Sequence, residues 1–133
     1  MQTDPEGRAF ATAFLHAFES LDLARVGACF ADDASVFFPA PEPPARVSGR
    51  AAIVQRFEQV FAGIRAASGR SAPPWHELAP VDLQARALGP DAALVTFELR
   101  NAQRLARRTL VLRRQADGWR ILHLHASNAG ETT

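Results

Sequence analysis

The sequence predicts an α+β domain in which helices cover one face of a curved β-sheet. In the first half of the chain, apolar residues recur at i, i+3 and i+4, the spacing of an amphipathic helix. From Trp75 onward the period changes to two, which is typical of strands. Helices followed by a run of strands indicate an α+β unit. With 133 residues and 47% hydrophobic content, we expect a single domain over residues 1–133.

The first two helices are predicted to form a bent pair. Thr3 and Glu6 have the spacing of a capping box at the start of the first helix. Apolar residues then repeat at helical spacing up to Leu21, which predicts about four turns. Asp22 can cap a second, shorter helix, which we expect to end at residues 31–33.

A third helix is predicted after a short strand and a proline-rich loop. Residues 34–38 have the composition of a strand, and the prolines within residues 39–44 lack the N–H donors that a sheet needs. Ser48 can cap the helix that follows. Its apolar stripe consists of Ile53, Val54, Phe57, Val60, Phe61 and Ile64.

Four strands are predicted in the second half of the chain. They occupy residues 76–88, 92–101, 105–115 and 119–128. The expected turns between them are residues 89–91, 101–103 and 116–118. Because these turns are short, we expect consecutive strands to pair in an antiparallel manner.

The last predicted strand carries a histidine pair. Side chains alternate across a strand, so Ile121, His123 and His125 are expected on one face. Leu122 and Leu124 lie on the opposite face, which should pack against the helices. The histidines are therefore expected on the outer face of the sheet.

Two histidines on one strand could share a metal ion, but zinc sites usually need further protein ligands. Neither His16 nor His76 is placed by the sequence to supply them. We therefore interpret His123 and His125 as a hydrogen-bonded surface or interface pair, and we expect no metal and no cofactor.

Charge and composition argue against several classes of function. All fifteen basic residues are Arg, but the net charge is only +1. Neighbours such as Arg107 and Arg108 point to opposite faces of a strand, so no basic stripe for nucleic acid forms. No segment approaches the ~20 apolar residues of a membrane span, and residues 1–6 have no basic stretch followed by an apolar run, so we expect no signal sequence. We expect a cytoplasmic protein in which Cys29, the only cysteine, is a buried inert thiol.

The order of several motifs resembles a known group of folds. The helix pair is followed by residues 30–36 (FADDASV), 49–53 (GRAAI) and 118–127 (GWRILHLHAS). Together they resemble the nuclear transport factor 2-like superfamily, and more narrowly its SnoaL-like branch and the calmodulin-dependent kinase II association domain. The resemblance implies a cystatin-like, cone-shaped barrel, in which a strongly curved mixed sheet wraps a long N-terminal helix, encloses an apolar cavity and often pairs into dimers.

Catalytic groups of the enzymes in this superfamily are largely missing. The resemblance to steroid isomerases implies a carboxylate base and a tyrosine, but the base position falls near Phe38 and the chain has no Tyr. Scytalone dehydratase-like members also need Tyr. The resemblance to epoxide hydrolase-like members implies an Asp-Arg-Asp set on inward positions, whereas Asp82 and Arg86 fall opposite the apolar side chains of their strand. The resemblance to SnoaL-like cyclases implies a lone Asp as acid/base, for which Asp33 is the candidate. We interpret Asp33 instead as ending the second helix or capping the turn beyond it.

Three hypotheses follow. The first is a homodimeric protein whose cavity binds a small apolar molecule, with Trp75 near its mouth and walls formed by Phe14, Phe38, Phe57, Phe97, Leu99 and Leu124. The second is a small cyclase- or isomerase-like enzyme of secondary metabolism that uses Asp33, His16 or Thr109 as its polar group. The third is a self-association module without ligand that uses an outer face formed by Glu98, Arg100, Arg108, His123 and His125.

Overall fold

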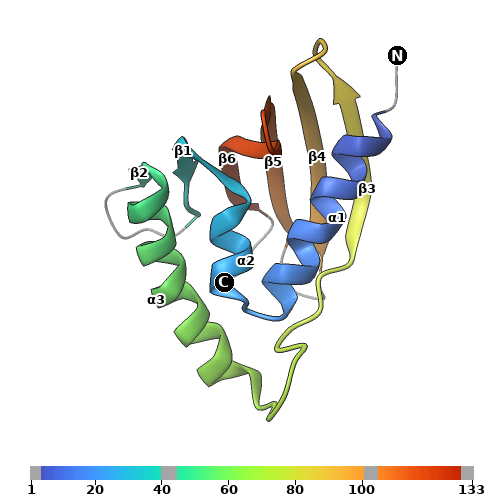
Figure 1. Ribbon diagram of the computed structural model, residues 1–133. Coiled ribbons are helices and arrows are strands. Elements are labelled where there is room, and N and C mark those ends of the chain that lie inside the picture. Colours follow the sequence, from blue (N-terminus) through green and yellow to red (C-terminus); the bar gives the residue numbers. More distant parts are fainter. Residues whose placement is uncertain (1–3, 40–44, 101–104, 130–133) are drawn as a thin grey trace.

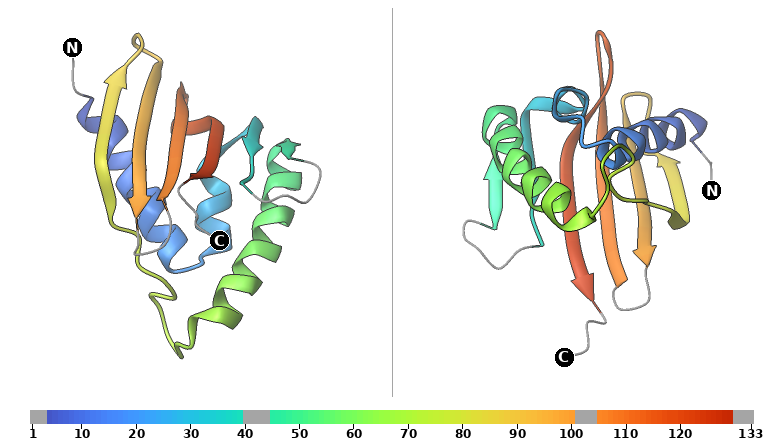
Figure 2. Two further views of the ribbon diagram at one scale, coloured as in Figure 1. Left: turned by 180° about the vertical axis from the view of Figure 1, so that it is seen from behind. Right: turned by 90° about the horizontal axis from the view of Figure 1, so that it is seen from below.

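The computed structural model describes residues 4–39, 45–100 and 105–129, which form three helices packed on one side of a six-stranded sheet (Figure 1). The strand order is β2-β1-β6-β5-β4-β3. All neighbouring strands are antiparallel except β1 and β6, which run parallel. The predicted α+β class with a curved mixed sheet is confirmed. The sheet is open, with β2 and β3 at its edges, and the helices rather than further strand pairing close the cone (Figure 2).

Helix α1 spans Pro5–Glu19. Asp4 caps it by accepting hydrogen bonds from the backbone N–H groups of Glu6 and Gly7, both 3.1 Å away. Pro5 has no backbone N–H, but at the first position of a helix this group would have no acceptor within the helix. The prediction of four turns is confirmed, but the cap is Asp4 rather than Thr3, which lies outside the described residues.

Helix α2 spans Leu23–Ala28 and is capped by Asp22, as predicted. It ends earlier than expected, because the chain enters strand β1, Phe30–Phe37, where a helical continuation was predicted. Parallel pairing with β6 explains the difference, since Phe30 lies opposite Ile121 and the Ile121 N–H donates to the Cys29 carbonyl at 2.7 Å. Cys29 is half-buried, and burial raises the pKa of its thiol.

Strand β2, Arg46–Ser48, and helix α3, Arg50–Ser68, follow the proline-rich segment. The sequence pattern did not reveal β2. Ser48 belongs to this strand and does not cap α3. The cap position is Gly49, whose φ of +90° is a conformation that residues with a side chain rarely adopt. Residues 40–44 lie outside the described residues.

The remaining strands are β3, Pro80–Ala87; β4, Ala92–Arg100; β5, Leu105–Gln115; and β6, Gly118–Ala129. They match the predicted runs, except that β3 begins after residues 76–79, which form an irregular segment. The predicted turn at residues 101–103 lies outside the described residues. Strand β5 pairs with β6 along its whole length and with β4 over residues 105–113, so it is the centre of this half of the sheet.

A bulge in β6 changes the predicted faces of the last strand. Val111 pairs with His123, but the next residue, Leu112, pairs with Ile121, which leaves Leu122 as an extra residue. Ile121 therefore faces the core and is fully buried, whereas it was expected beside His123 on the outer face. His123 and the residues after the bulge keep their predicted faces.

The core fills the space between the concave face of the sheet and the helices. Its largest fully buried side chains are Val26, Phe30, Val36, Ile53, Val95, Leu110, Leu112 and Ile121. No charged residue is buried among the described residues. No helix of the described part is long and apolar enough to cross a membrane.

Candidate ligand-binding pocket

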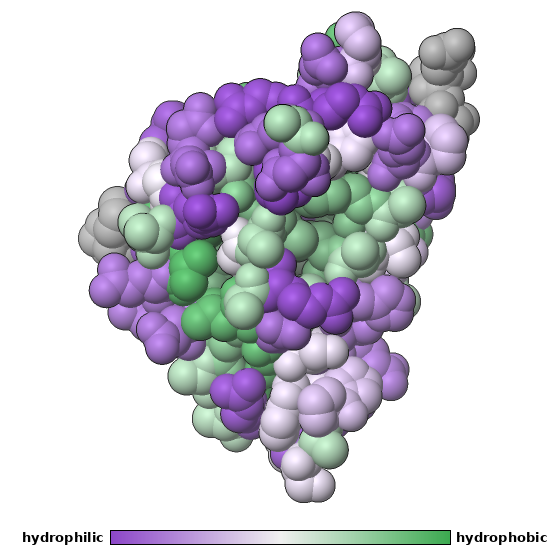
Figure 3. All heavy atoms as spheres, viewed as in Figure 1, coloured by the Kyte–Doolittle hydropathy of each residue, from purple (hydrophilic) through white to green (hydrophobic). Residues whose placement is uncertain are grey.

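A cavity of about 470 Å³ lies between helices α1 and α3 and the concave face of the sheet. Strands β1, β4, β5 and β6 form one wall, and residues 76–79, between α3 and β3, form part of the rim. Figure 3 shows apolar surface gathered between α1 and α3, with polar and charged residues around it. The volume falls within the range of small-molecule sites, about 300–1,000 Å³.

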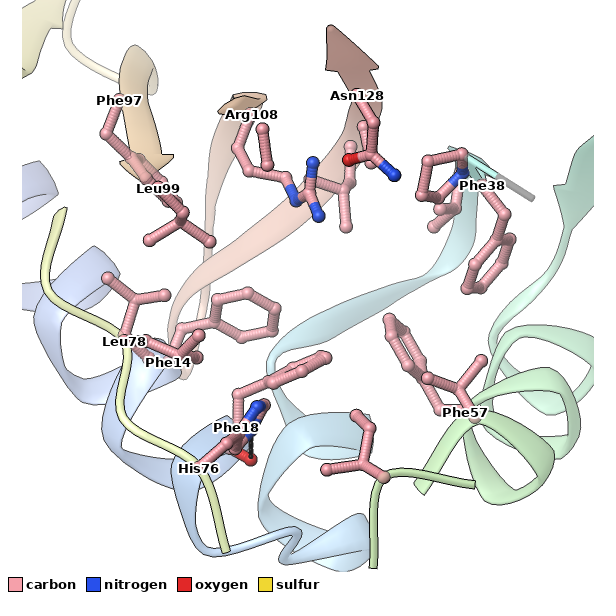
Figure 4. A pocket seen from close by; sticks show the side chains of 18 of the residues that line it. Phe14, Phe18, Phe38, Phe57, His76, Leu78, Phe97, Leu99, Arg108 and Asn128 are labelled. Carbon is pink, nitrogen blue, oxygen red and sulfur yellow. Dashed lines mark hydrogen bonds between the residues drawn. The ribbon is translucent and has the colours of Figure 1, made fainter. Parts of the chain in front are cut away.

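Phenylalanine rings form much of the wall (Figure 4). The ring of Phe57, on α3, lies 5.1 Å from that of Phe38 and 5.7 Å from that of Phe18, measured between centroids. Both pairs have edge-to-face geometry, which aromatic rings prefer over a face-to-face stack. Phe14 is 6.1 Å from Phe18 on the same helix. The rings link α1, β1 and α3 around the cavity.

The structure places most residues of the predicted pocket on the wall of this cavity. These are Phe14, Phe38, Phe57, Phe97, Leu99 and Leu124. Trp75 does not line it. Its backbone N–H donates to the Glu19 carbonyl at 2.9 Å, and the guanidinium of Arg65 stacks 5.1 Å from its ring. Trp75 is therefore held against the ends of α1 and α3, and residues 76–79 lie at the rim in its place.

Arg108 lies on the cavity wall, although the sequence analysis assigned it to the outer face. Its side chain is on the same, inward-facing side of strand β5 as those of Ala106 and Leu110, both of which are buried. Its Nη1 donates to the carbonyls of Arg107, at 2.9 Å, and Ser127, at 3.2 Å. Burial lowers the pKa of its guanidinium, although arginine remains charged in proteins.

Other polar residues lie toward the rim. The Nε2 of His76 is 2.9 Å from the Phe18 carbonyl, and a carbonyl can only accept, so Nε2 carries the proton. Arg100 also borders the cavity but pairs with Glu98 at 2.6 Å on the outer side of β4. Glu77 is mostly exposed and 3.9 Å from Arg70. These groups surround the opening of a cavity whose interior is mostly apolar apart from Arg108 and Asn128.

None of the three candidate catalytic residues lines the cavity. Asp33 lies in β1, where both its oxygens accept from Arg113, at 2.7 and 3.2 Å, and this contact lowers the pKa of the carboxyl. His16 is on the exposed face of α1, 3.5 Å from Glu19. Thr109 is on the outward-facing side of β5 and pairs with His125 of β6. Assigning Asp33 to the end of the second helix was wrong, because β1 already begins at Phe30.

The outer face of the sheet holds the predicted histidine pair. His123 Nδ1 is 2.7 Å from the Ser35 hydroxyl, and the rings of His123 and His125 lie 5.5 and 5.4 Å from that of Phe37. Burial lowers the pKa of His123, and the neighbouring charges of His125 and Arg46 lower it further. No group of three or more metal-ligating side chains occurs within the described ranges.

Several residues of the cavity were not predicted from the sequence. The alternation of side chains along a strand could have identified Arg108 and Asn128. Each is on the inward face of its strand together with buried residues, such as Leu110 for Arg108 and Ala126 for Asn128. His76 has no such signal, since it lies in an irregular segment whose path depends on tertiary contacts.

The chain matches the family described as the SnoaL-like domain over residues 8–130. Its fold is shared with a nuclear transport factor 2-like protein of unknown function from Pseudomonas putida KT2440, with a TM-score of 0.73, 22% identity and coverage of 90% of this chain and 82% of that one. A ketosteroid isomerase-like protein from Erwinia carotovora atroseptica SCRI1043 has the same fold, with a TM-score of 0.71, 20% identity and coverage of 92% of this chain and 93% of that one.

A protein with a cystatin-like fold from Caulobacter vibrioides gives a TM-score of 0.72 at 19% identity, covering 92% of this chain and 86% of that one. At these identities the structural likeness establishes the fold alone. No curated protein shows significant sequence similarity to the chain.

Proposed function

The chain belongs to the SnoaL-like domain family, within the nuclear transport factor 2-like superfamily, and from this premise we propose that it binds a small hydrophobic molecule in its cavity. The observation that carries the proposal is the cavity of about 470 Å³ with a wall of phenylalanine and aliphatic side chains. Apolar walls with few polar groups are typical of small-molecule sites.

The chemistry of the lining favours binding over catalysis. Among the described lining residues the only carboxylate is that of Glu77, whose side chain is 75% exposed and 3.9 Å from Arg70. Phe38 occupies the wall near the position where the resemblance to steroid isomerases implies a base. The chain contains no tyrosine. A general acid or base should lie within hydrogen-bonding reach of the reacting group, inside the cavity.

The binding proposal is tested with N-phenyl-1-naphthylamine, a neutral fluorophore whose emission rises in apolar surroundings. We expect saturable binding to the wild-type protein. Ala126→Trp, which places an indole in the cavity, should weaken binding at least about tenfold. Ala62→Trp adds the same bulk on the exposed side of α3 and should not. Equal binding by Ala126→Trp and the wild type, or no binding by either, would contradict the proposal.

A cyclase- or isomerase-like reaction is the second candidate function, and His76 is the observation that favours it. With Nε2 donating to the Phe18 carbonyl, Nδ1 of the neutral ring is left as a basic nitrogen at the cavity rim. If the protein is an enzyme, a cavity-bound compound should change in mass or isomeric composition on incubation. His76→Gln should abolish that change while binding persists.

We further propose that the protein is a homodimer formed through the outer face of the sheet. The helices lie on the opposite side, as Figures 1 and 2 show, so no described helix covers this face. Its centre carries the half-buried Leu94, Val111 and Phe37 beside His123. Sedimentation velocity should give a dimer that Val111→Glu dissociates and Leu88→Glu, in the β3–β4 turn, does not. A monomeric wild type would rule the dimer out.

A further inference from the structure

Strand register turns Arg108 into the cavity. Arg108 pairs with Phe97 of β4 on one side and with Ala126 of β6 on the other, and both of these residues line the cavity. Directly paired residues on neighbouring strands point to the same face of a sheet. The guanidinium therefore enters a space whose walls are mostly apolar, and Figure 4 shows it directed into the pocket.

The described residues satisfy only part of the hydrogen-bonding capacity of the Arg108 guanidinium. Within the described ranges it donates two hydrogen bonds, both from Nη1 to backbone carbonyls, those of Arg107 and Ser127. Arginine has five N–H donors. Among the described residues no carboxylate lies within ion-pair distance of Arg108, whereas Arg50, Arg113 and Arg114 each have one.

Other charges at the cavity do not neutralise Arg108. Glu77 is the only described carboxylate of the lining, and it lies 3.9 Å from Arg70. Arg100 is held by Glu98, which lies on the far side of the sheet. Arg56 lies with its guanidinium 4.9 Å from the Phe38 ring and adds positive charge at the lining.

Burial makes this charge, which has no carboxylate partner among the described residues, energetically unfavourable, as the lowered pKa of Arg108 indicates. A carboxylate accepts two parallel hydrogen bonds from a guanidinium, the strongest arrangement available to arginine. Asn128 lies beside Arg108 in Figure 4, and its carboxamide supplies further donors at the same end of the cavity.

We infer that the molecule bound in the cavity carries a carboxylate, which pairs with Arg108 and Asn128 while its apolar body lies against the phenylalanine rings. This inference rests on the proposed binding function and specifies the class of ligand: a small aromatic or aliphatic carboxylic acid. The polar end faces β5 and β6, and the apolar end faces α1 and α3.

The experiment compares two probes of nearly equal shape, 2-naphthoate and its neutral amide, 2-naphthamide, by calorimetric titration of the full-length protein. We expect the wild type to bind the carboxylate at least about tenfold more tightly. Arg108→Gln should reduce carboxylate binding to the level of the amide and leave amide binding unchanged. Arg108→Lys, which keeps the charge, should retain part of the preference.

Arg107→Gln is the matched control, because Arg107 is exposed on the outer face of the same strand and should leave both affinities unchanged. Equal affinity of the wild type for the two probes would overturn the inference and leave the binding function in place. Equal loss of both probes in Arg108→Gln would assign Arg108 a structural role and also overturn it. If the wild type bound neither probe and no neutral fluorophore, both proposals would fall.

Discussion

Gly27 of α2 lies so close to Val54 of α3 that a Cβ atom on Gly27 would come within 2.8 Å of Val54 Cγ2. Real side chains essentially never approach so closely, so this contact requires glycine. Val54 is β-branched and has little rotational freedom in a helix, so it cannot easily turn away. The contact fixes how α3, which carries Phe57, packs beside the cavity.

Gly27→Ala should therefore destabilise the protein, although alanine favours helix more than glycine does. We expect a net loss of about 1–2 kcal/mol, because overpacking exceeds the gain in helix propensity. Gly63→Ala in α3, where a new Cβ meets nothing within 4 Å, should instead stabilise by about 0.5–1 kcal/mol. Urea unfolding measures both. Restored stability in Gly27→Ala/Val54→Ala would identify the clash as the cause, whereas a stabilised Gly27→Ala would contradict the close packing.

Leu110 and Leu124 pair across β5 and β6 but differ in what lies beyond their side chains. Leu110 is fully buried and does not line the cavity, so Leu110→Ala should create a new void and lose about 2–5 kcal/mol of unfolding free energy. Leu124 borders the cavity, and Leu124→Ala should only enlarge it, with a loss of about 1–2 kcal/mol. Equal losses in chemical denaturation would mean that the cavity collapses around Leu124.

Asp33→Asn should leave binding in the cavity unchanged, because Asp33 pairs with Arg113 away from the lining. Its folded-state pKa is lowered, so the stability that it contributes is present above the ordinary carboxyl pKa and is lost as pH falls through the folded-state value. The variant should be slightly less stable at neutral pH and lose less stability on acidification. Acid unfolding and fluorophore titration check the two parts. Weakened binding would return Asp33 to the list of site residues.

The sequence predicted elements whose periodicity is set by burial on one face. Val95, Phe97 and Leu99 alternate with polar residues, and the structure places all three on the concave side. Such alternation depends only on the geometry of the strand and on which of its faces is buried, so it can be recognised in the sequence. The helices were predicted for the same reason, with errors confined to caps and ends.

Features that depend on pairing between distant segments were not predictable. The bulge at Leu122 appears only when β6 aligns with β5, and β2 exists as three residues because β1 offers it an edge. Arg108 was assigned to the outer face, although alternation along β5 puts it on the same side as Leu110 and Leu112. The buried positions of Leu110 and Leu112 on the same face were the correct signal.

His123 should make the stability of the fold depend on pH below neutrality. Burial favours its neutral form, and His125 and Arg46 add unfavourable positive charge, so its folded-state pKa lies below the ordinary value. Between those two pKa values the unfolded chain binds more protons, and stability rises with pH. The contribution is therefore present above about pH 6.5, the ordinary histidine value, and is lost as pH falls toward the folded-state pKa.

His123→Gln should remove this part of the pH dependence, because glutamine has no proton to bind. Unfolding free energies measured by urea titration from about pH 7.5 down to about pH 5.5, where a histidine with its ordinary pKa titrates, should fall less for the variant than for the wild type. Ser127→Ala, on the same face of β6, leaves His123 in place and should retain the wild-type dependence. If His123→Gln and the wild type lost stability in parallel, His123 would carry its proton equally well in the folded and unfolded chains. The partly buried site beside Ser35 and Phe37 argues against that result, since protonation there places a charge where solvation is reduced.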